Sequence, residues 1–344
     1  MRDLLRQVSR SFYLTLRILP RSVNPQLSLA YLLARATDTV ADTELIEARR
    51  RMEALQQMRK SIQEACQGEK PALPDLGDLS AAQTTVAGKG NPAERILLEN
   101  LGDILDDLRQ FSAEDRRHVG HVLEIITSGQ EMDLQRFHNA SADRIVALDT
   151  QWDLDRYIYS VAGCVGEFWT KMCRAHVFPD EALDDSILLA NGTRFGKGLQ
   201  LVNILRDLPR DLRQGRCYIP QDQLSKHGLQ PRDLLDASQM DRFRPLYEEY
   251  LRQTEDHLAA GWLYTTMLPA RYMRVRLACS WPILIGVRTI EDLRRGNVLD
   301  DRFHIRIAQS DTWRLLLRTI VFYPAPKIWN GLFGSVRRKA SRKL

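Results

Sequence analysis

The sequence predicts an all-α fold, a helical bundle around a central apolar cavity, with residues 1–330 forming a single domain. Apolar residues recur at helical spacing along most of the chain, as Leu4, Val8 and Phe12 do. The alternation of apolar and polar residues that is typical of strands is almost absent, and there is no repeat of fixed period. Residues 331–344 are expected to be a basic tail.

Helical periodicity, together with prolines and glycines, places the expected elements along the chain. The first helical pattern ends at Pro20, and Pro25 opens the next helix. Residues 68–92 are rich in Pro, Gly and small polar residues, so we expect a loop there. Further helices are expected at 44–66, 93–110, 113–137, about 153–176, from 180 into the stretch 198–220, and at 240–267, 269–295 and 311–322.

Composition narrows the possible partners without selecting one. The 344-residue chain has a net charge of +5 and a pI near 9.0, which suits an anionic substrate or an anionic membrane surface. Lysines and arginines are mixed with acids and form no basic stripe interleaved with aromatics, which argues against nucleic acid as a partner. The oligomeric state is left open.

Cysteine usage and hydropathy indicate a cytoplasmic protein that is not integral to a membrane. The five cysteines are odd in number and show no CxxC spacing, as expected for reduced thiols. The charged segment 1–10 does not resemble a signal peptide. The longest apolar runs, 277–287 and 315–322, fall short of the roughly 18 residues that a spanning helix needs.

Asp207 and Asp211 are four residues apart in the stretch 198–220 and therefore share one face of a helix. Asn203 and Gln200 lie one and two turns upstream on the same face. The neighbouring residues are mostly apolar, and carboxylates in such surroundings are costly to bury unless a cation meets them. Mg²⁺ prefers oxygen ligands and is typically held by one or two carboxylates plus substrate phosphates. Because Pro209 lies between the two acids, a kink that turns Asp211 away from Asp207 is expected.

A second acidic pair occurs earlier in the chain. Asp38 and Asp42 repeat the four-residue spacing after an apolar run, with Arg35 one turn before them. Asp-x-x-x-Asp is common on solvated helix faces, so one pair alone would say little. Two pairs on separate apolar helices predict two facing metal platforms with a diphosphate between them.

Such platforms suit the ionisation of an allylic diphosphate. Metal ions and arginines would offset the charge that develops on the departing pyrophosphate. The carbocation left behind requires a dry, apolar cavity, and aromatic faces would stabilise it.

Four stretches in this chain resemble the motifs of the squalene and phytoene synthases, the head-to-head prenyl transferases, and they occur in the same order. They are Ser9-Arg-Ser-Phe12, Arg35-Ala-Thr-Asp-Thr-Val-Ala-Asp42, Tyr157-Ile-Tyr-Ser-Val-Ala-Gly-Cys-Val-Gly166 and Gln200-Leu-Val-Asn-Ile-Leu-Arg-Asp207. The resemblance covers about residues 9–220. Within the family, the chain is most similar to bacterial squalene synthases. The resemblance implies the isoprenoid-synthase type of all-α fold.

The resemblance also implies a reaction and its residues. Two farnesyl diphosphates would condense through presqualene diphosphate, a cyclopropyl intermediate, to squalene, with Mg²⁺ as metal and NADPH as reductant. No dinucleotide fingerprint is present, so NADPH rests on the resemblance alone. Tyr157 would assist proton removal when the cyclopropane closes. The metal ligands and catalytic acids would be Asp38, Asp42, Asp207 and Asp211, and the substrate-binding residues would be Arg10, Ser11, Phe12, Arg35, Gln200, Asn203 and Arg206.

Several alternatives stay open at this point. A phytoene or dehydrosqualene synthase would use no reductant, and another type of family enzyme stops at presqualene diphosphate. A non-catalytic relative would act as an assembly or lipid-binding factor, although intact acids on an apolar wall argue against it.

Two further features have an expected structural or surface role. Gly163, Gly166, Gly196 and Gly198 are expected to be close-packing positions between helices rather than a phosphate cradle. The segment 328–343 carries apolar residues followed by five cations. It would be either a frayed terminus or an interfacial membrane anchor built on Ile328, Trp329, Leu332, Phe333 and Val336.

Overall fold

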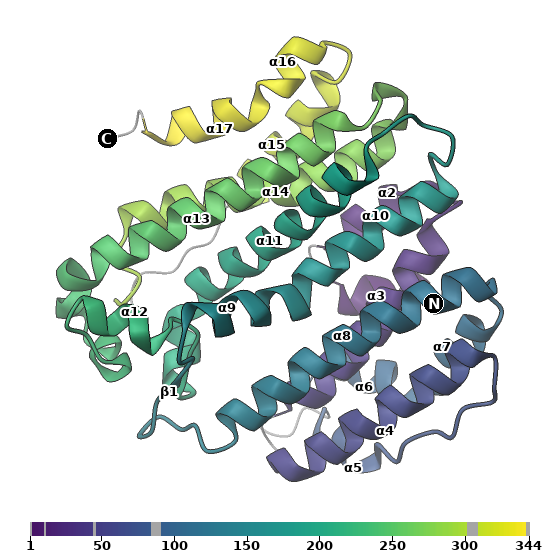
Figure 1. Ribbon diagram of the computed structural model, residues 1–344, viewed down its shortest axis with the longest axis horizontal. Coiled ribbons are helices and arrows are strands. Elements are labelled where there is room, and N and C mark those ends of the chain that lie inside the picture. Colours follow the sequence, from purple (N-terminus) through teal and green to yellow (C-terminus); the bar gives the residue numbers. More distant parts are fainter. Residues whose placement is uncertain (1, 10–11, 44–45, 84–90, 301–308, 342–344) are drawn as a thin grey trace. The chain divides into compact units, whose positions relative to one another are not determined.

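The computed structural model describes residues 2–9, 12–43, 46–83, 91–300 and 309–341 and confirms the predicted all-α class. Within these residues the only strands are the two-residue β1 (Val146–Ala147) and β2 (Arg216–Cys217). The chain forms two compact units, one of residues 1–138 and 168–181 and the other of residues 139–167 and 182–344. The elements of each are labelled in Figure 1.

Unit 1 is built around α3 (Asn24–Asp42) and α8 (Ala113–Phe137), which pack against each other and against α4 (Ala48–Gln67). The segment Phe168–Glu181, which holds most of α10 (Cys164–His176), also belongs to this unit. Its other helices are α1 (Arg2–Val8), α2 (Phe12–Ile18), α5 (Gly77–Ala82), α6 (Pro92–Glu99) and α7 (Leu101–Arg109).

Two expectations for this part of the chain are wrong in detail. The segment 68–92 is not wholly a loop, because α5 forms inside it and buries Leu79 completely. The single helix expected at 93–110 is two helices, α6 and α7, which meet at Asn100.

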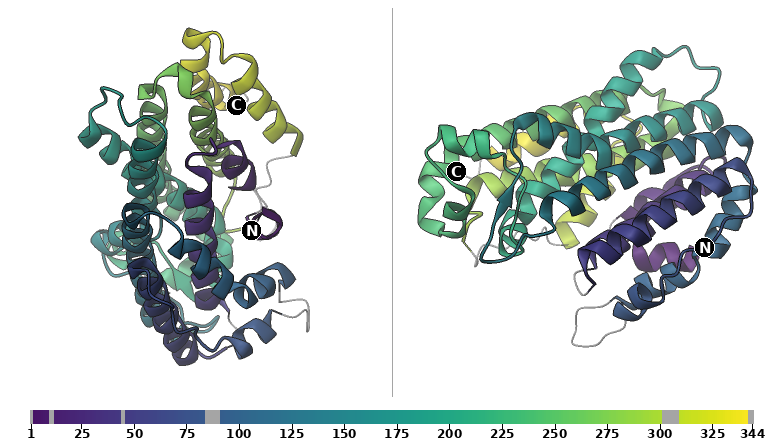
Figure 2. Two further views of the ribbon diagram at one scale, coloured as in Figure 1. Left: turned by 90° about the vertical axis from the view of Figure 1, so that its right-hand side faces the viewer. Right: turned by 60° about the horizontal axis from the view of Figure 1, so that its bottom comes forward.

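Unit 2 is built around α11 (Asp185–Arg213) and α13 (Met240–Met267), which pack along each other and against α14 (Met273–Arg295). Figure 2 shows the C-terminal segment beside these green helices. The remaining elements are α9 (Gln151–Ile158), the π-helical turn η2 (Tyr159–Gly163), α12 (Gln221–Lys226), the 3₁₀ turns η3 (Pro231–Leu235), η4 (Ala237–Gln239) and η5 (Ala270–Tyr272), α15 (Gln309–Val321), α16 (Pro326–Asn330) and α17 (Leu332–Ser341).

The two short strands tie the start of α9 to the end of α11. They pair in parallel, with Val146 opposite Arg216 and Ala147 opposite Cys217. Gly215, just before β2, has φ +80, and a Cβ there would lie 2.3 Å from the backbone nitrogen of Ser141, so only glycine fits.

Glycines let α11 approach the segment around η2 at backbone distance, as predicted. A Cβ on Gly166 would lie 1.8 Å from the carbonyl oxygen of Gly192, and one on Gly196 would lie 2.0 Å from that of Ala162. Contacts this short mean that the two backbones touch directly, and the position of α11 depends on them.

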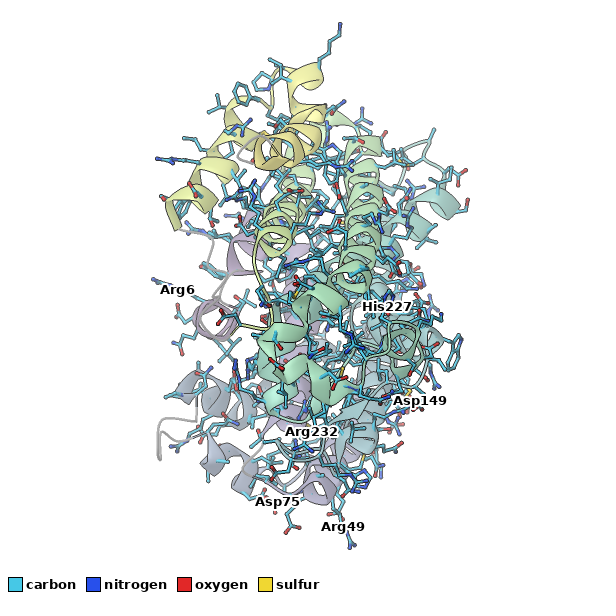
Figure 3. The ribbon with its side chains drawn as sticks, turned by 90° about the vertical axis from the view of Figure 1, so that its left-hand side faces the viewer. Arg6, Arg49, Asp75, Asp149, His227 and Arg232 are labelled. Atoms are coloured by element: carbon cyan, nitrogen blue, oxygen red, sulfur yellow. The ribbon has the colours of Figure 1, made fainter. Side chains whose placement is uncertain are left out.

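Charged side chains lie on the surfaces of both units. Arg49 and Asp75 of unit 1 and Arg232 of unit 2 are exposed examples (Figure 3). No helix within the described ranges has both the length and the hydrophobicity needed to cross a bilayer.

The C-terminal segment is folded onto unit 2, so it is not frayed, and three of the five residues expected to form an anchor are buried. Within the described ranges it is helical to Ser341 rather than frayed. Trp329, Leu332 and Val336 are buried, and Trp329 stacks on Trp262 of α13 with ring centroids 5.0 Å apart. These three side chains are therefore part of the core and do not form a membrane anchor.

Gly166→Ala should destabilise the protein strongly, because the added methyl group meets a backbone carbonyl that no side-chain rotation can move. We expect a loss of about 1–3 kcal/mol or more in the free energy of unfolding, measured by urea denaturation. Gly77→Ala is the matched control, since its Cβ meets only the Asp75 carboxylate at 3.4 Å. Equal denaturation midpoints for the two variants would contradict close packing at Gly166.

Candidate functional site

The first acidic pair lies on α3, whose opposite face is embedded in the core of unit 1. Pro25 occupies the first turn, where the missing N–H carries no penalty. Residues on the inner face are fully buried, including Leu29, Leu32, Leu33, Ala36 and Val40. Arg35, Asp38 and Asp42 lie on the more accessible side, so the apolar face fixes the helix on which they stand.

Arg35 links the first acidic pair to a third carboxylate. Its Nη1 donates to Asp38 Oδ2 at 2.6 Å, and its Nη2 is hydrogen-bonded to Glu94 of α6. Asn91 caps α6 and also donates to Glu94, at 2.9 Å. The Nε of Arg35 is buried without a hydrogen-bond partner in the described part of the chain. Burial acts to lower the pKa of Arg35, but the charges of Asp38 and Glu94 outweigh it and raise the pKa.

Asp38 is held in an unfavourable electrostatic position. Its side chain keeps 41% of its surface accessible, yet protein atoms crowd around the carboxylate. This desolvation raises the pKa of Asp38 to about 7, and the negative charge of Asp42 adds to the increase. Arg35 opposes the shift without cancelling it. A carboxylate in this state gains from a cation beyond the one that Arg35 supplies.

Aromatic rings stand next to this pair. Phe12 of α2 stacks on Tyr31 of α3, with ring centroids 5.4 Å apart and an angle of 23° between the planes. Tyr31 precedes Arg35 by one helical turn. The predicted role of Phe12 as a cavity-lining residue stays a prediction, while Arg10 and Ser11 lie outside the described residues.

The second acidic pair lies on α11 in unit 2. Asp184 caps this helix by accepting from the backbone nitrogens of Ser186 and Ile187 at 2.9 and 3.1 Å. Asp207 and Asp211 occupy successive turns of the helix, as predicted. Gln200 and Asn203 share their face, which is accessible where Asn203 stands. The opposite face is buried through Leu201, Leu205, Leu208 and Leu212.

Arg206 neutralises Asp207 through two parallel hydrogen bonds. Its Nε and Nη2 donate to Oδ1 and Oδ2 of Asp207 at 2.8 and 2.7 Å, the forked geometry that makes arginine–carboxylate pairs strong. The hydrogen bonds to Asp207 raise the pKa of Arg206 despite burial, and the charge of Asp211 contributes to the same shift. Asp211 therefore lies within electrostatic reach of Arg206.

The helix continues through Pro209 to Arg213, and a neighbouring tyrosine explains how. Proline has no N–H, so the carbonyl of Leu205, four residues earlier, loses its helical hydrogen bond. The hydroxyl of Tyr247, a fully buried residue of α13, donates to this carbonyl at 3.0 Å. Tyr247 thus replaces the missing donor, and Asp211 stays in a continuous helix one turn beyond Asp207.

Tyr157 lies at the end of α9 and stacks on Tyr218, which follows β2. The ring centroids are 4.8 Å apart and the planes 22° from parallel. Thr150 and Asp153 cap α9 through a reciprocal capping box. The π-helical turn η2 begins two residues after Tyr157, and single π turns are frequent at functional sites.

The structure thus groups the predicted residues by unit. Unit 1 brings together Arg35 and Asp38, and unit 2 brings together Arg206 and Asp207. Three residues that sequence reasoning missed take part: Glu94, Tyr218 and Tyr247. Glu94 gave no signal in the sequence, because an acidic residue in the first turn of a helix is common. Tyr218 falls within the stretch 198–220, where an aromatic residue just after the acidic helix was an available signal.

Both acidic pairs offer the hard oxygen ligands that Mg²⁺ prefers. No group of three or more His, Cys, Asp or Glu side chains able to hold a metal is found within the described ranges. Each pair supplies two carboxylates, and a bound diphosphate and water would have to complete the coordination.

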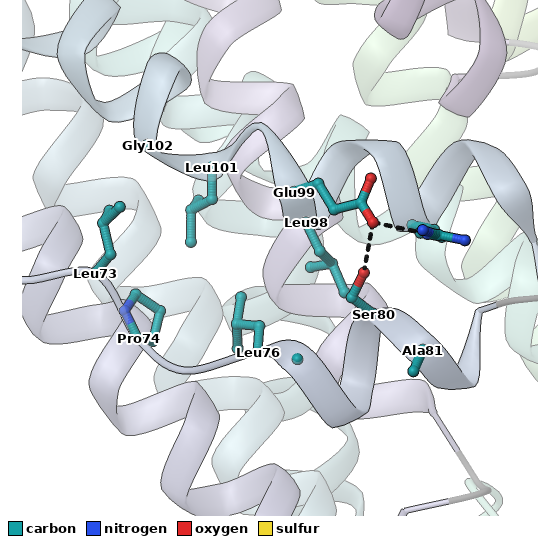
Figure 4. A pocket seen from close by; sticks show the side chains of 11 residues that line it. Leu73, Pro74, Leu76, Ser80, Ala81, Leu98, Glu99, Leu101 and Gly102 are labelled. Atoms are coloured by element: carbon teal, nitrogen blue, oxygen red, sulfur yellow. Dashed lines mark hydrogen bonds and ion pairs between the residues drawn. The ribbon is translucent and has the colours of Figure 1, made fainter.

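A pocket of about 510 Å³ lies elsewhere in unit 1, between the segment 73–81 and helices α6 and α7 (Figure 4). Its polar side chains are Ser80, Arg95 and Glu99, and Glu99 accepts hydrogen bonds from Ser80 at 3.3 Å and Arg95 at 2.7 Å. No predicted site residue lines this pocket. The Glu99 carboxylate is already hydrogen-bonded to Ser80 and Arg95, so the pocket is not assigned to the functional site.

Asp38→Asn should stabilise the protein without divalent metal at pH 8, and the gain should shrink at pH 5. The folded-state pKa of about 7 lies above the ordinary value of 3.8, so ionised Asp38 destabilises the fold above pH 7. This penalty fades as the pH falls towards 4. Thermal denaturation of the two proteins in EDTA at both pH values measures the effect, and a stability difference independent of pH would contradict it.

Tyr247→Phe should destabilise the protein by about 1–3 kcal/mol, because it leaves the buried Leu205 carbonyl without a donor. Tyr264→Phe is the matched control, a fully buried tyrosine of the same helix away from Pro209, and replacement of Pro209 by Ala should recover none of its loss. The measurement is the free energy of unfolding in urea. Additional replacement of Pro209 by Ala should recover most of the loss in Tyr247→Phe, since alanine restores the backbone donor. A double variant as unstable as Tyr247→Phe would contradict this role of Tyr247.

Comparison with known proteins identifies the family. The squalene/phytoene synthase family profile matches residues 5–309. The chain is 30% identical over 225 residues to the bifunctional lycopene cyclase/phytoene synthase of Blakeslea trispora, covering 65% of this chain and 33% of that protein. It is 26% identical over 234 residues to the squalene synthase of Saccharomyces cerevisiae, covering 68% and 48%. The chain thus matches a third to a half of the length of these relatives.

The fold agrees with solved structures of similar proteins. A structure of TcSQS with a bound ligand superimposes with a TM-score of 0.71 at 18% identity, covering 98% of this chain and 97% of that one. The helical architecture, the two acidic helices and the match over 305 residues lead to one conclusion. The chain belongs to the squalene/phytoene synthase family of head-to-head prenyl transferases.

Proposed function

We propose that this chain joins two farnesyl diphosphate molecules head to head, through presqualene diphosphate, and reduces the product to squalene with NADPH. The observation that carries the proposal is the repeated pair of an arginine and an aspartate, Arg35 with Asp38 and Arg206 with Asp207. Each stands on a helix whose opposite face is buried. Such groups suit a substrate with a highly charged diphosphate and a long apolar chain.

The acidic pairs are the proposed metal ligands. Asp38 and Asp42 on α3, and Asp207 and Asp211 on α11, would hold Mg²⁺. When bound, the metal would offset the charge that develops on the leaving pyrophosphate. The raised pKa of Asp38 fits this assignment, because a cation would relieve its repulsion from Asp42.

The arginines would bind and orient the diphosphate. Arg35 keeps 28% of its side chain accessible beside Asp38, so its guanidinium could also meet a substrate oxygen. Arg206 is held in the fork of Asp207 and keeps 39% of its side chain accessible. Gln200 and Asn203, on the same face of α11, would contact the diphosphate or water around it. Arg10 and Ser11 are proposed as further residues that bind a diphosphate.

Tyr157 is proposed to assist the loss of the proton when the cyclopropane ring closes. Its ring is fixed against Tyr218, and two stacked aromatic faces also suit a nearby carbocation. The apolar helix faces, with Phe12 among them, would exclude water that would otherwise quench the cation.

Two neighbouring reactions are the second candidates, because the matched relatives include enzymes named for them. Phytoene synthase activity occurs in the name of the Blakeslea protein, and other relatives are named presqualene diphosphate synthases. A phytoene- or dehydrosqualene-forming enzyme would need no reductant, and a presqualene diphosphate synthase would stop at the intermediate. A non-catalytic relative is disfavoured by the retained acids.

Product analysis tests the proposal. The full chain is incubated with farnesyl diphosphate and Mg²⁺, and in parallel with geranylgeranyl diphosphate and Mg²⁺, each with and without NADPH. The extracted products are identified by mass spectrometry. Squalene formed only with NADPH is the expected result. Dehydrosqualene regardless of NADPH, presqualene diphosphate as the end product, or phytoene made from geranylgeranyl diphosphate would each replace the proposal by the corresponding alternative.

Asp38→Asn and Asp207→Asn should each lower turnover by about 100-fold or more while the protein stays folded. Asp185→Asn, on an exposed acid at the start of α11, is the matched control and should keep full activity. Release of pyrophosphate measures turnover, and circular dichroism checks the fold. Turnover near normal in either site variant would refute the assignment of that pair.

A further inference from the structure

Helix α15 presents an apolar stripe on the surface of unit 2. Trp313, Leu317 and Val321 are each 60% exposed and Ile320 is 43% exposed. Their spacing of four, three and one residues places all four on one face of the helix. A contiguous set of large exposed apolar side chains on a monomer marks a surface that meets something else.

The apolar stripe lies on the outer face of α15, and the inner face of α15 packs against α14 and α16. Leu316 and Thr319 are buried. The indole nitrogen of Trp281 on α14 donates to the Thr319 hydroxyl at 2.9 Å, and that of Trp329 donates to the Thr319 carbonyl at 3.0 Å. These bonds fix the rotation of α15 about its own axis. The stripe therefore faces outward because the inner face is committed to the core.

The charge of this part of the chain is almost entirely positive. Residues 309–344, from the start of α15, contain eight Lys and Arg and one acid, Asp311. The rest of the chain has 41 Lys and Arg against 43 Asp and Glu, a net charge of −2. The overall charge of +5 thus arises entirely from the last 36 residues, which begin with α15.

Cations flank the stripe directly. Arg314 follows Trp313, and its side chain is 77% exposed, with only a 3.3 Å contact to Asp311. Arg318 lies one turn further and donates to Ser335 of α17 at 3.4 Å. On the next helix, α16, Lys327 is exposed beside Ile328, which is 55% exposed.

We propose that α15 lies in the interface of an anionic phospholipid membrane. Trp313, Leu317, Ile320 and Val321 would enter the boundary between headgroups and acyl chains, and the surrounding cations would contact the lipid phosphates. An amphipathic helix with tryptophan on its apolar face and arginine on its flank has the composition of interfacial helices. Basic residues near an anionic surface contribute attraction that salt weakens.

The charge pattern favours a membrane over a protein partner. From the start of α15 to the end of the chain there are eight cations and one acid, Asp311, and such an excess of positive charge beside apolar side chains is complementary to anionic lipid. This surface replaces the anchor expected from Trp329, Leu332 and Val336, which are buried. The inference concerns the surface of unit 2 and does not depend on the proposed reaction.

Vesicle binding by the full chain tests the proposal. Sedimentation is measured with vesicles of phosphatidylcholine and phosphatidylglycerol at 70:30 and with phosphatidylcholine alone, at low and high salt. We expect binding to the anionic vesicles that weakens by about tenfold or more at high salt, and weak binding to the neutral ones.

Matched pairs of variants locate the contact. Trp313→Ser and Leu317→Ser should each lower the affinity for anionic vesicles about tenfold, because they remove apolar contact with the lipid. Trp152→Ser and Leu235→Ser remove exposed side chains of the same types from elsewhere in unit 2 and should change nothing. Arg314→Gln combined with Arg318→Gln should weaken the preference for anionic lipid.

Two outcomes would overturn the proposal. One is vesicle binding that the stripe variants leave unchanged, since the membrane contact would then lie elsewhere. The other is absence of vesicle binding, in which case light scattering of the wild type and Trp313→Ser shows whether a second copy covers the stripe. Arg318 is half-buried and the other substituted residues are exposed, and circular dichroism confirms that each variant is folded.

Discussion

The proposed site depends on carboxylates that lie on the accessible face of helices whose other face is buried. A helix such as α3 or α11 is fixed by the face it buries, and only a helix fixed in this way can hold charged groups in a defined place. In both, one carboxylate of the pair has an arginine partner, Arg35 for Asp38 and Arg206 for Asp207. Without that partner, the desolvation of the carboxylate would oppose burial of the helix itself.

The arginines leave the two pairs in different electrostatic states. Asp207 shares both oxygens with one arginine in a forked arrangement. Desolvation by the surrounding protein and the charge of Asp42 raise the pKa of Asp38 to about 7, and Arg35, which Asp38 shares with Glu94, does not cancel the shift. The first pair therefore holds two carboxylates that repel each other, which fits the proposal that it binds a cation.

The fold class and the acidic helices could be predicted from sequence, because both are local properties of the chain. Helical period, proline positions and four-residue spacing are visible without knowing what packs where. The bounds of α8 and α13 were predictable for this reason. The break at Asn100 was not, since residues 93–110 keep a helical period on both sides of it and packing decides where the chain turns.

The partners of the site residues could not be predicted, because they come from distant positions. Glu94 is 59 residues from Arg35, and Tyr247 is 42 residues from Leu205. Tyr247 shows why a local rule fails here. Proline is expected to kink a helix because it removes one hydrogen bond, but a tyrosine from α13 supplies the missing donor and α11 continues. The burial of Trp329 and Leu332 is a similar case, since a segment with anchor-like composition folds onto α13 and α14 instead.

The position of Asp38 bears on whether the chain is a catalyst or a silent relative. An isosteric asparagine would keep the shape of α3 and avoid the repulsion from Asp42. A chain that served only as a scaffold would have no physical reason to hold an aspartate whose ionisation the surrounding protein opposes. A bound cation would screen the repulsion between Asp38 and Asp42, and this relief would add to the free energy of cation binding. The position of Asp38 beside Asp42 therefore supports the proposal that this pair takes up a cation together with an anionic substrate.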